Sequence, residues 1–215
     1  MRRILIIDGH EVVREGLKRI LEEQSGPIVV GEASAPSEAI KLARERDWDA
    51  AVLALALGDR GGLEVLKELK RIRSTMPVLV FTMYPETHYA RRAFKAGAAG
   101  YITKDSPRGE VVKAINRVIE GGRYVSASVA EALSADLVRG TDRPPHETLS
   151  DREFEVLRWI GLGKTVSEIA GVLSLSDKTV STYRARLLEK MGLQTNAQLI
   201  RYAIRNKLAD PLDEV

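Results

Sequence analysis

The sequence predicts an α/β domain followed by a smaller all-α domain. Over roughly the first 120 residues, short apolar runs alternate with segments of helical spacing, five of each. A polar stretch with two adjacent prolines, residues 140–147, then interrupts the pattern, and the residues up to about 208 show helical patterns only. Strands that alternate with helices predict a (βα)5 doubly wound parallel sheet covered on both faces, and the C-terminal part is predicted to be a four-helix domain.

The five predicted strands are short apolar runs, each followed by a helix. The helices around Leu17 and Leu66 show most clearly the i, i+4, i+7 spacing of an amphipathic helix. Ligands of doubly wound sheets bind at the carboxyl ends of the strands, so residues that follow the strands are the first candidates for a site. The predicted strands are Ile4–Ile7, Ile28–Gly31, Ala51–Leu55, Val78–Phe81 and Tyr101–Thr103.

The C-terminal half is predicted to begin with one more helix, Ser128–Val138, and a linker. Pro144 and Pro145 neither continue a helix nor pair in a sheet. Ser150 with Glu153 forms a capping box that starts a helix through Ile160, and the later predicted helices are 165–173, 176–191 and 196–206. The predicted boundaries are 1–122 for the α/β domain, 123–147 for the linker helix and flexible linker, 148–208 for the four-helix domain and 209–215 for a tail.

Composition excludes several classes of protein. The chain has 215 residues, 44% apolar and 29% charged, a balance that supports a folded core. It has no cysteine, which excludes disulfides, thiolate zinc sites and a cysteine nucleophile, and its three histidines are scattered. The longest apolar run, Ala50–Leu57, is too short for a membrane helix, and the residues after Arg2 and Arg3 form no signal peptide. We expect a cytoplasmic protein that is not an enzyme and uses no metal or cofactor, since no nucleophile–base pair, metal cluster or phosphate loop is present.

A helix-turn-helix is predicted within the all-α domain. Residues 148–208 hold ten Lys and Arg against six Asp and Glu, a modest excess compatible with nucleic acid. On a helical wheel of residues 176–191, Val180, Leu187, Leu188 and Met191 cluster on one face and the opposite face is free. In a DNA groove, Ser and Thr can form hydrogen bonds with several bases, and Ala can contact a thymine methyl group. The alternative interpretation of this segment is a plain helical hairpin whose charged side chains are solvated. The free face comprises Lys178, Ser181, Thr182, Ala185, Arg186 and Glu189, with Tyr183 at its border and Arg184 on the packed side.

The order and spacing of several motifs resemble a known family. A close resemblance to the LuxR-type helix-turn-helix is found in the segments Leu149–Leu157, Ser167–Ala170, Leu175–Val180 and Leu188–Met191. A resemblance to a receiver domain is found in the segments Ile6–Leu17, Val29–Ala33, Pro77–Met83 and Ala96–Asp105. In this order, and over nearly the whole chain, the two domains resemble a response regulator of the NarL/FixJ family.

The resemblance implies a DNA interface on the second helix of the helix-turn-helix. By position, Lys178, Thr179, Tyr183 and Arg186 resemble contacts to the DNA backbone, and Ser181, Thr182 and Ala185 resemble the groove-facing group. Family members bind DNA as dimers, so the expected partner is double-stranded DNA with paired half-sites about one helical turn apart. The receiver is a possible site for a protein partner or small ligand, and no membrane partner is expected.

The receiver departs from the family pattern at two positions. A conventional receiver accepts a phosphoryl group on an aspartate that ends the third strand and holds Mg²⁺ with that residue and an acidic pair that ends the first strand. Here the acidic pair reads Asp8-Gly9 and the acceptor position is Ala54. Asp49 lies at the opposite end of the strand, roughly 16 Å away at the strand rise, and Asp59 lies in the following loop, so neither is a credible acceptor.

Other parts of the receiver pattern persist: Thr82, Tyr101 and Lys104 match the residues that in a receiver transmit the phosphorylated state. Without an acceptor carboxylate, we predict that Lys104 pairs with Asp8. The alternative for Thr82 and Lys104 is inherited packing without a switching role. The predicted degenerate pocket comprises Asp8, Gly9, Ala54, Thr82, Tyr101 and Lys104.

Three functions fit these patterns. The first is a sequence-specific transcription regulator that works without phosphorylation. The second is a phospho-dead Asp-to-Ala variant of a conventional two-component regulator; Gly9 argues against it, because a single designed change would leave the acidic pair intact. The third is a protein-interaction adaptor with a vestigial DNA-binding helix. The free face of residues 176–191 argues against this third function.

Overall fold

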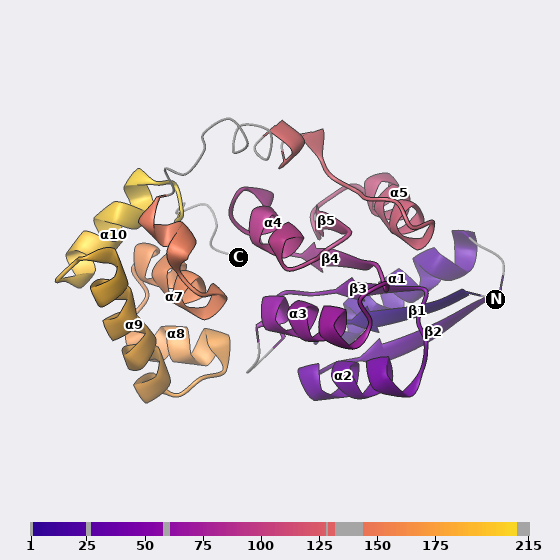
Figure 1. The fold of residues 1–215 in the computed structure, drawn as a ribbon, viewed down its shortest axis with the longest axis horizontal. Coiled ribbons are helices and arrows are strands. Elements are labelled where there is room, and N and C mark those ends of the chain that lie inside the picture. The colour runs from indigo at the N-terminus through magenta and orange to yellow at the C-terminus, as the bar shows by residue number, and fades with distance from the viewer. Residues whose placement is uncertain (1, 25–26, 58–60, 128, 132–143, 210–215) are drawn as a thin grey trace. The chain divides into compact units, whose positions relative to one another are not determined.

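The computed structural model describes residues 2–24, 27–57, 61–127, 129–131 and 144–209 (Figure 1). The chain divides into two compact units, Met1–Asp136 and Leu137–Val215. The first contains a five-stranded sheet with helices, and the described part of the second contains helices only. The predicted fold class, a (βα)5 doubly wound parallel sheet followed by a four-helix domain, is confirmed.

The sheet of the first unit is parallel throughout and has the strand order β2-β1-β3-β4-β5. All five predicted strands exist, but the third ends at Leu53 instead of Leu55. Its pairing stops because the carbonyl of Leu55 turns away to accept a hydrogen bond from Gly62 N, at the start of the next helix (2.9 Å). The strands are β1 Arg2–Ile7, β2 Ile28–Ala33, β3 Ala50–Leu53, β4 Val78–Thr82 and β5 Gly100–Thr103.

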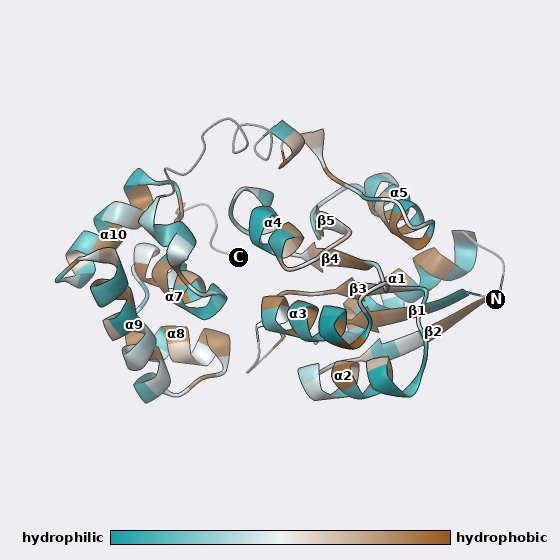
Figure 2. Ribbon diagram, in the orientation of Figure 1, coloured by the Kyte–Doolittle hydropathy of each residue, from teal (hydrophilic) through white to brown (hydrophobic). Residues whose placement is uncertain are grey.

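Helices cover both faces of the sheet. On one face, Leu17 and Leu21 of α1 and Val111 and Ile115 of α5 join alternate strand residues in a single buried core. On the other face, α2, α3 and α4 pack side by side. Figure 2 shows these helices with a hydrophobic and a hydrophilic side, which is why each has one face on the sheet. The bounds are α1 Glu11–Gln24, α2 Pro36–Glu45, α3 Gly62–Ile72, α4 Glu86–Lys95 and α5 Arg108–Ile119.

The segment after α5, which the sequence assigns to the linker, pairs with the edge of the sheet. Tyr124 forms an isolated parallel bridge with Gly100, and its amide donates to the carbonyl of Ala99 (3.0 Å). The Tyr124 hydroxyl donates to Glu110 of α5 (2.6 Å) and the Ser126 hydroxyl to Glu86 of α4 (2.5 Å). Most of the predicted helix 128–138 lies outside the described residues.

Four α-helices form the described part of the second unit, each within one residue of its predicted bounds. A short 3-10 helix, η1 Pro145–Thr148, precedes them where the sequence suggests only linker. It packs through His146, whose Nδ1 lies 2.9 Å from the hydroxyl of Tyr202. Capping boxes at Ser150, Thr165 and Thr195 start three of the helices. The helices are α7 Asp151–Gly161, α8 Val166–Leu173, α9 Asp177–Met191 and α10 Asn196–Arg205.

Within the described ranges, every helix is too short or too polar to span a lipid bilayer.

Candidate functional site

Four of the predicted pocket residues meet at the carboxyl edge of the sheet. Asp8 follows β1 and Ala54 follows β3, and the two strands are in register at Ile7 and Leu53, with Ala54 N donating to Ile7 O (2.8 Å). Thr82 ends β4, and Lys104 follows β5, with its amide bonded to the carbonyl of Thr82 (2.8 Å). Parallel pairing therefore places these positions on adjacent strands, as the sequence predicts.

Asp8 is the buried charge of this pocket, with 1% of its surface exposed. Its Oδ2 lies 2.6 Å from Lys104 Nζ, which confirms the predicted ion pair. Its Oδ1 accepts a hydrogen bond from the backbone amide of His10 (2.9 Å) and lies 3.0 Å from His10 Nδ1. Sequence reasoning missed His10; its position two residues after Asp8, in the loop that leads into α1, is the signal that was available.

Thr82 and Tyr101 make their contacts with the loop between β4 and α4. Both are buried, at 1% exposure. Thr82 Oγ1 accepts a hydrogen bond from Tyr84 N (3.3 Å), and the Tyr101 hydroxyl donates to Tyr84 O (2.8 Å). The Tyr84 ring stacks on Tyr89 of α4 (4.6 Å between centroids). Both predicted pocket residues therefore hold Tyr84 in place, and this residue carries no motif that would have marked it in the sequence.

The residues present do not fit the Mg²⁺ of a conventional receiver. Mg²⁺ requires near-octahedral oxygen ligands and is usually held by one or two free carboxylates together with phosphate oxygens and waters. Here Gly9 and Ala54 offer no side-chain oxygen, and both oxygens of Asp8 are already engaged by Lys104 and His10. Within the described ranges, moreover, no cluster of three or more His, Asp or Glu residues is arranged to hold a metal.

Lys104→Ala tests the strength of the Asp8 ion pair. Removal of the ammonium leaves a buried carboxylate with His10 as its remaining side-chain partner, so we expect the free energy of unfolding to fall by about 2 kcal/mol. Urea denaturation measures the loss, and Lys113→Ala, which removes an exposed lysine, is the control. Equal stability of the Lys104 variant and the wild type would show that the pair contributes nothing.

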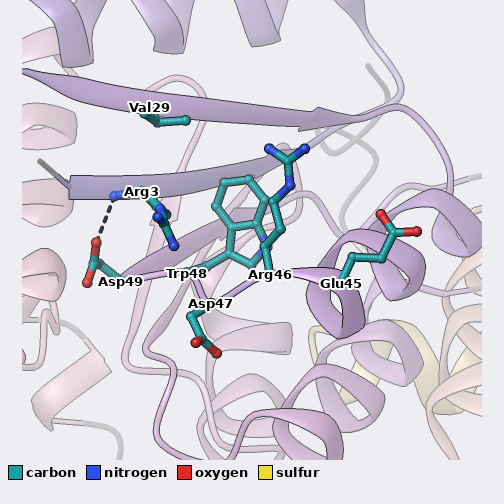
Figure 3. A pocket seen from close by; sticks show the side chains of 7 residues that line it. All are labelled: Arg3, Val29, Glu45, Arg46, Asp47, Trp48 and Asp49. Atoms are coloured by element: carbon teal, nitrogen blue, oxygen red, sulfur yellow. Dashed lines mark hydrogen bonds between the residues drawn. The ribbon is translucent and has the colours of Figure 1, made fainter.

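A hollow lies at the opposite, amino end of the strands (Figure 3). It has a volume of 740 Å³, and at its wall the Asp49 carboxylate accepts a hydrogen bond from the backbone amide of Arg3 (2.7 Å). This contact agrees with the inference that Asp49 lies far from the acceptor position. Asp47 pairs with Arg73 (2.7 Å), and Trp48 donates from Nε1 to Leu42 O (2.9 Å), so these two side chains serve the fold. Asp59 lies outside the described residues.

The second candidate site is the free face of α9. Val180 and Leu187 are completely buried where α9 packs on α7 and α8, whereas Leu188 and Met191 are only half-buried. Thr179 and Tyr183 are half-buried at the border of the opposite face. The side chains that are exposed on that face are Lys178, Ser181, Thr182, Ala185, Arg186 and Glu189.

The basic residues of α9 differ in their partners. Arg184, which the wheel places on the packed side, is half-buried and donates from Nε to Asn196 Oδ1 (2.7 Å). Lys190 pairs with Glu153 of α7 (2.7 Å). Lys178 and Arg186 are exposed, and neither side chain has an ionic or hydrogen-bond partner within the part of the chain that the structure describes. Two unpaired cations thus flank the small side chains of one exposed helix face, a pattern suited to phosphate groups.

Backbone amides at the start of a helix can bind phosphate, but those of α9 are not all free. The amide of Thr179 donates to the hydroxyl of the capping residue Ser176 (3.1 Å), so it is already used. The carboxylate of Asp177 also stands in the first turn, where it accepts a hydrogen bond from Ser167 of α8. These hydrogen bonds hold the start of α9 to the turn between α8 and α9.

Acidification is expected to weaken the ion pair that joins Lys190 of α9 to Glu153 of α7. Burial raises the pKa of Glu153, but the ammonium of Lys190 and the donors of Ser150 outweigh it, so the pKa of this carboxyl lies below its usual range. Its contribution to stability is complete above the unfolded-state value of 4.5 and is lost as the pH falls through the folded-state pKa.

This pH dependence is measurable by urea denaturation from neutral pH to about pH 3. In a Trp48→Phe background, fluorescence reports Trp159 of α7. We expect Glu153→Gln to flatten the loss of stability below pH 4.5, whereas Glu189→Gln, on the exposed face of α9, leaves it unchanged. Equal slopes in both variants would exclude Glu153 as the source.

Comparison with known proteins places both units. The protein-family model described as "response regulator receiver domain" matches residues 4–116, and the family model described as "bacterial regulatory proteins, luxR family" matches residues 147–203. The response regulator UvrY of Escherichia coli K12 is 34% identical over 211 residues, which cover 98% of this chain and 97% of UvrY. The response regulator GacA of Pseudomonas aeruginosa is 35% identical over 211 residues, covering 98% and 99% of the two chains.

Solved structures show the same architecture. A LuxR-family two-component response regulator from Aurantimonas sp. SI85-9A1 is 38% identical, with a TM-score of 0.58, and covers 63% of this chain and 97% of its own. RcsB of Salmonella enterica serovar Typhimurium, bound to the promoter rprA in the presence of phosphomimetic BeF3⁻, is 25% identical with a TM-score of 0.62. That alignment covers 94% of this chain and 98% of RcsB.

A receiver sheet joined to a LuxR-type helix-turn-helix defines a DNA-binding response regulator that controls transcription, not an enzyme. The chain belongs to the NarL/FixJ family of response regulators, as its relation to UvrY and GacA over nearly their full length shows.

Proposed function

We propose that this protein is a sequence-specific transcription regulator of the cytoplasm that binds paired DNA half-sites as a homodimer and works without phosphorylation. The observation that carries the proposal is the ion pair between Lys104 and Asp8 beside Ala54. The receiver then serves as a dimerisation or partner-sensing module.

The chemistry of the pocket supports phosphorylation independence. A methyl group at Ala54 accepts no phosphoryl group, and Gly9 supplies no second carboxylate for a metal. Lys104, the cation that would meet phosphoryl oxygens, is already neutralised by Asp8 at 2.6 Å. The acceptor and one metal-binding carboxylate are therefore both missing, and the second loss, at Gly9, favours a natural atypical receiver over a single silencing substitution.

The surface of α9 supports DNA binding. Lys178 and Arg186 are exposed and unpaired within the described residues, and Ser181, Thr182 and Ala185 stand between them with side chains short enough for base edges to approach. A vestigial helix in an adaptor would have no reason to keep its free cations on one face. RcsB, a relative of the same architecture, was solved bound to a promoter. The two-fold symmetry of a dimer predicts half-sites about one helical turn apart.

The test selects bound fragments from a genomic library with the full-length protein and titrates the best site with and without Mg²⁺ and beryllium fluoride, a phosphoryl mimic. We expect specific binding whose affinity differs by less than about twofold between the two conditions. An affinity that rises tenfold or more with the mimic, on the order of 1.4 kcal/mol, would contradict phosphorylation independence.

Restoring the missing carboxylates sharpens the test. Ala54→Asp alone is expected to remain indifferent to beryllium fluoride, because Gly9 still lacks a metal-binding carboxylate. Ala54→Asp combined with Gly9→Asp is expected to gain a response, and Ala54→Asn with Gly9→Asn is the uncharged control. A full response of the single variant would favour a silenced conventional regulator.

A further inference from the structure

The hydroxyls on the free face of α9 are not equivalent. Thr182 Oγ1 donates to the carbonyl of Lys178, one turn earlier in the same helix (2.9 Å). A hydroxyl has a single proton to donate, so this bond leaves Thr182 with acceptor lone pairs and its methyl group. Thr182 therefore faces outward as an apolar and accepting side chain.

Ser181, the adjacent residue, is different. Its side chain is exposed, and its hydroxyl has no hydrogen-bond partner within the described ranges. The Thr179 hydroxyl lies 2.8 Å from that of Ser176, within the capping turn. Of the two exposed hydroxyls at positions 181 and 182, only that of Ser181 is thus free to donate to a ligand.

Ala185 extends the apolar character of Thr182. It is exposed, it follows Thr182 by three residues, and side chains three apart lie next to each other on a helix surface. The methyl groups of Thr182 and Ala185 therefore form a short apolar strip on a face that is otherwise polar. In the major groove, the thymine methyl is the group that such a strip contacts favourably, while guanine presents only acceptors at its edge.

We propose that Thr182 and Ala185 determine specificity by contacting thymine methyl groups, while Ser181 donates a hydrogen bond to a base acceptor. This rests on the proposed function, in which α9 enters the major groove. Guanine is disfavoured opposite Thr182, because a donor to its acceptors would first have to leave the carbonyl of Lys178.

The test uses the best genomic site and duplexes in which each thymidine in turn is replaced by deoxyuridine, which removes the methyl alone. We expect at least one replacement per half-site to weaken binding by the full-length wild type about fourfold, the effect of one buried methyl. Thr182→Val, which keeps the methyl and removes the hydroxyl, should bind within about twofold of wild type and keep this discrimination. Thr182→Ser, which keeps the hydroxyl and removes the methyl, should lose the discrimination between thymidine and deoxyuridine. Ser181→Ala should weaken binding and keep that discrimination.

These outcomes distinguish a failure of this inference from a failure of the proposed DNA binding. If Thr182→Val loses binding while Thr182→Ser retains it, the Thr182 hydroxyl contacts the base and the inference fails, although DNA binding stands. If the wild type binds no fragment specifically, both fail. Unchanged thermal midpoints of the variants establish that any loss arises at the DNA.

Discussion

Replacing Lys178 and Arg186 together with alanine is expected to weaken DNA binding on the order of tenfold or more, on specific and nonspecific duplexes alike. Both side chains are exposed and unpaired within the described residues, so their charges are free for phosphates, which do not depend on sequence. Each lost phosphate contact also lowers the slope of log K against log salt concentration by about 0.9. Fluorescence anisotropy titrations over a series of salt concentrations measure both effects.

The matched control is Arg184→Ala, which removes the same charge from the same helix. Arg184 is bonded to Asn196 and does not lie on the exposed face, so we expect its salt slope to equal that of the wild type. A salt slope in the double variant equal to that of Arg184→Ala would mean that general charge, and not the exposed face of α9, drives binding.

Gly62→Ala is expected to lower the free energy of unfolding by about 3 kcal/mol, the upper part of the range for overpacking. An added Cβ would lie 2.4 Å from Leu55 Cα and 2.5 Å from Ala54 O. Both are backbone atoms at the carboxyl edge of the sheet, so no side chain is able to rotate out of the way, and either α3 or the end of β3 must shift. Urea denaturation followed by Trp48 fluorescence, in a Trp159→Phe background, reports the effect in the first unit.

Gly16→Ala provides the control. This glycine lies within α1, and nothing stands within 4 Å of the position its Cβ would take. Alanine favours the helix over glycine there, so we expect stability to rise by about 0.5–1 kcal/mol. A Gly62 variant as stable as the wild type would show that the close contact between α3 and β3 is readily relieved.

Hydrophobic periodicity predicted the elements well, because each of them buries one face. All five strands and the four C-terminal α-helices were predictable, and the capping residue Ser150 placed the start of the first of these helices. Pattern reasoning erred where an apolar run continues beyond its pairing. Leu55 is as buried as the residues of β3, but its carbonyl bonds to Gly62 instead of a neighbouring strand.

The sequence by itself determined which residues stand at the strand ends and which face of α9 is free, because the positions of the strands along the chain and the helical period follow from local spacing. It also determined that Ala54 and Gly9 lack carboxylates. Only the tertiary structure decided what these residues touch. The hydrogen bond of Tyr101 to Tyr84 and the pairing of Tyr124 with Gly100 depend on how side chains fill space once the sheet has formed. Such contacts join positions whose separation in the chain follows no period, so packing alone selects them.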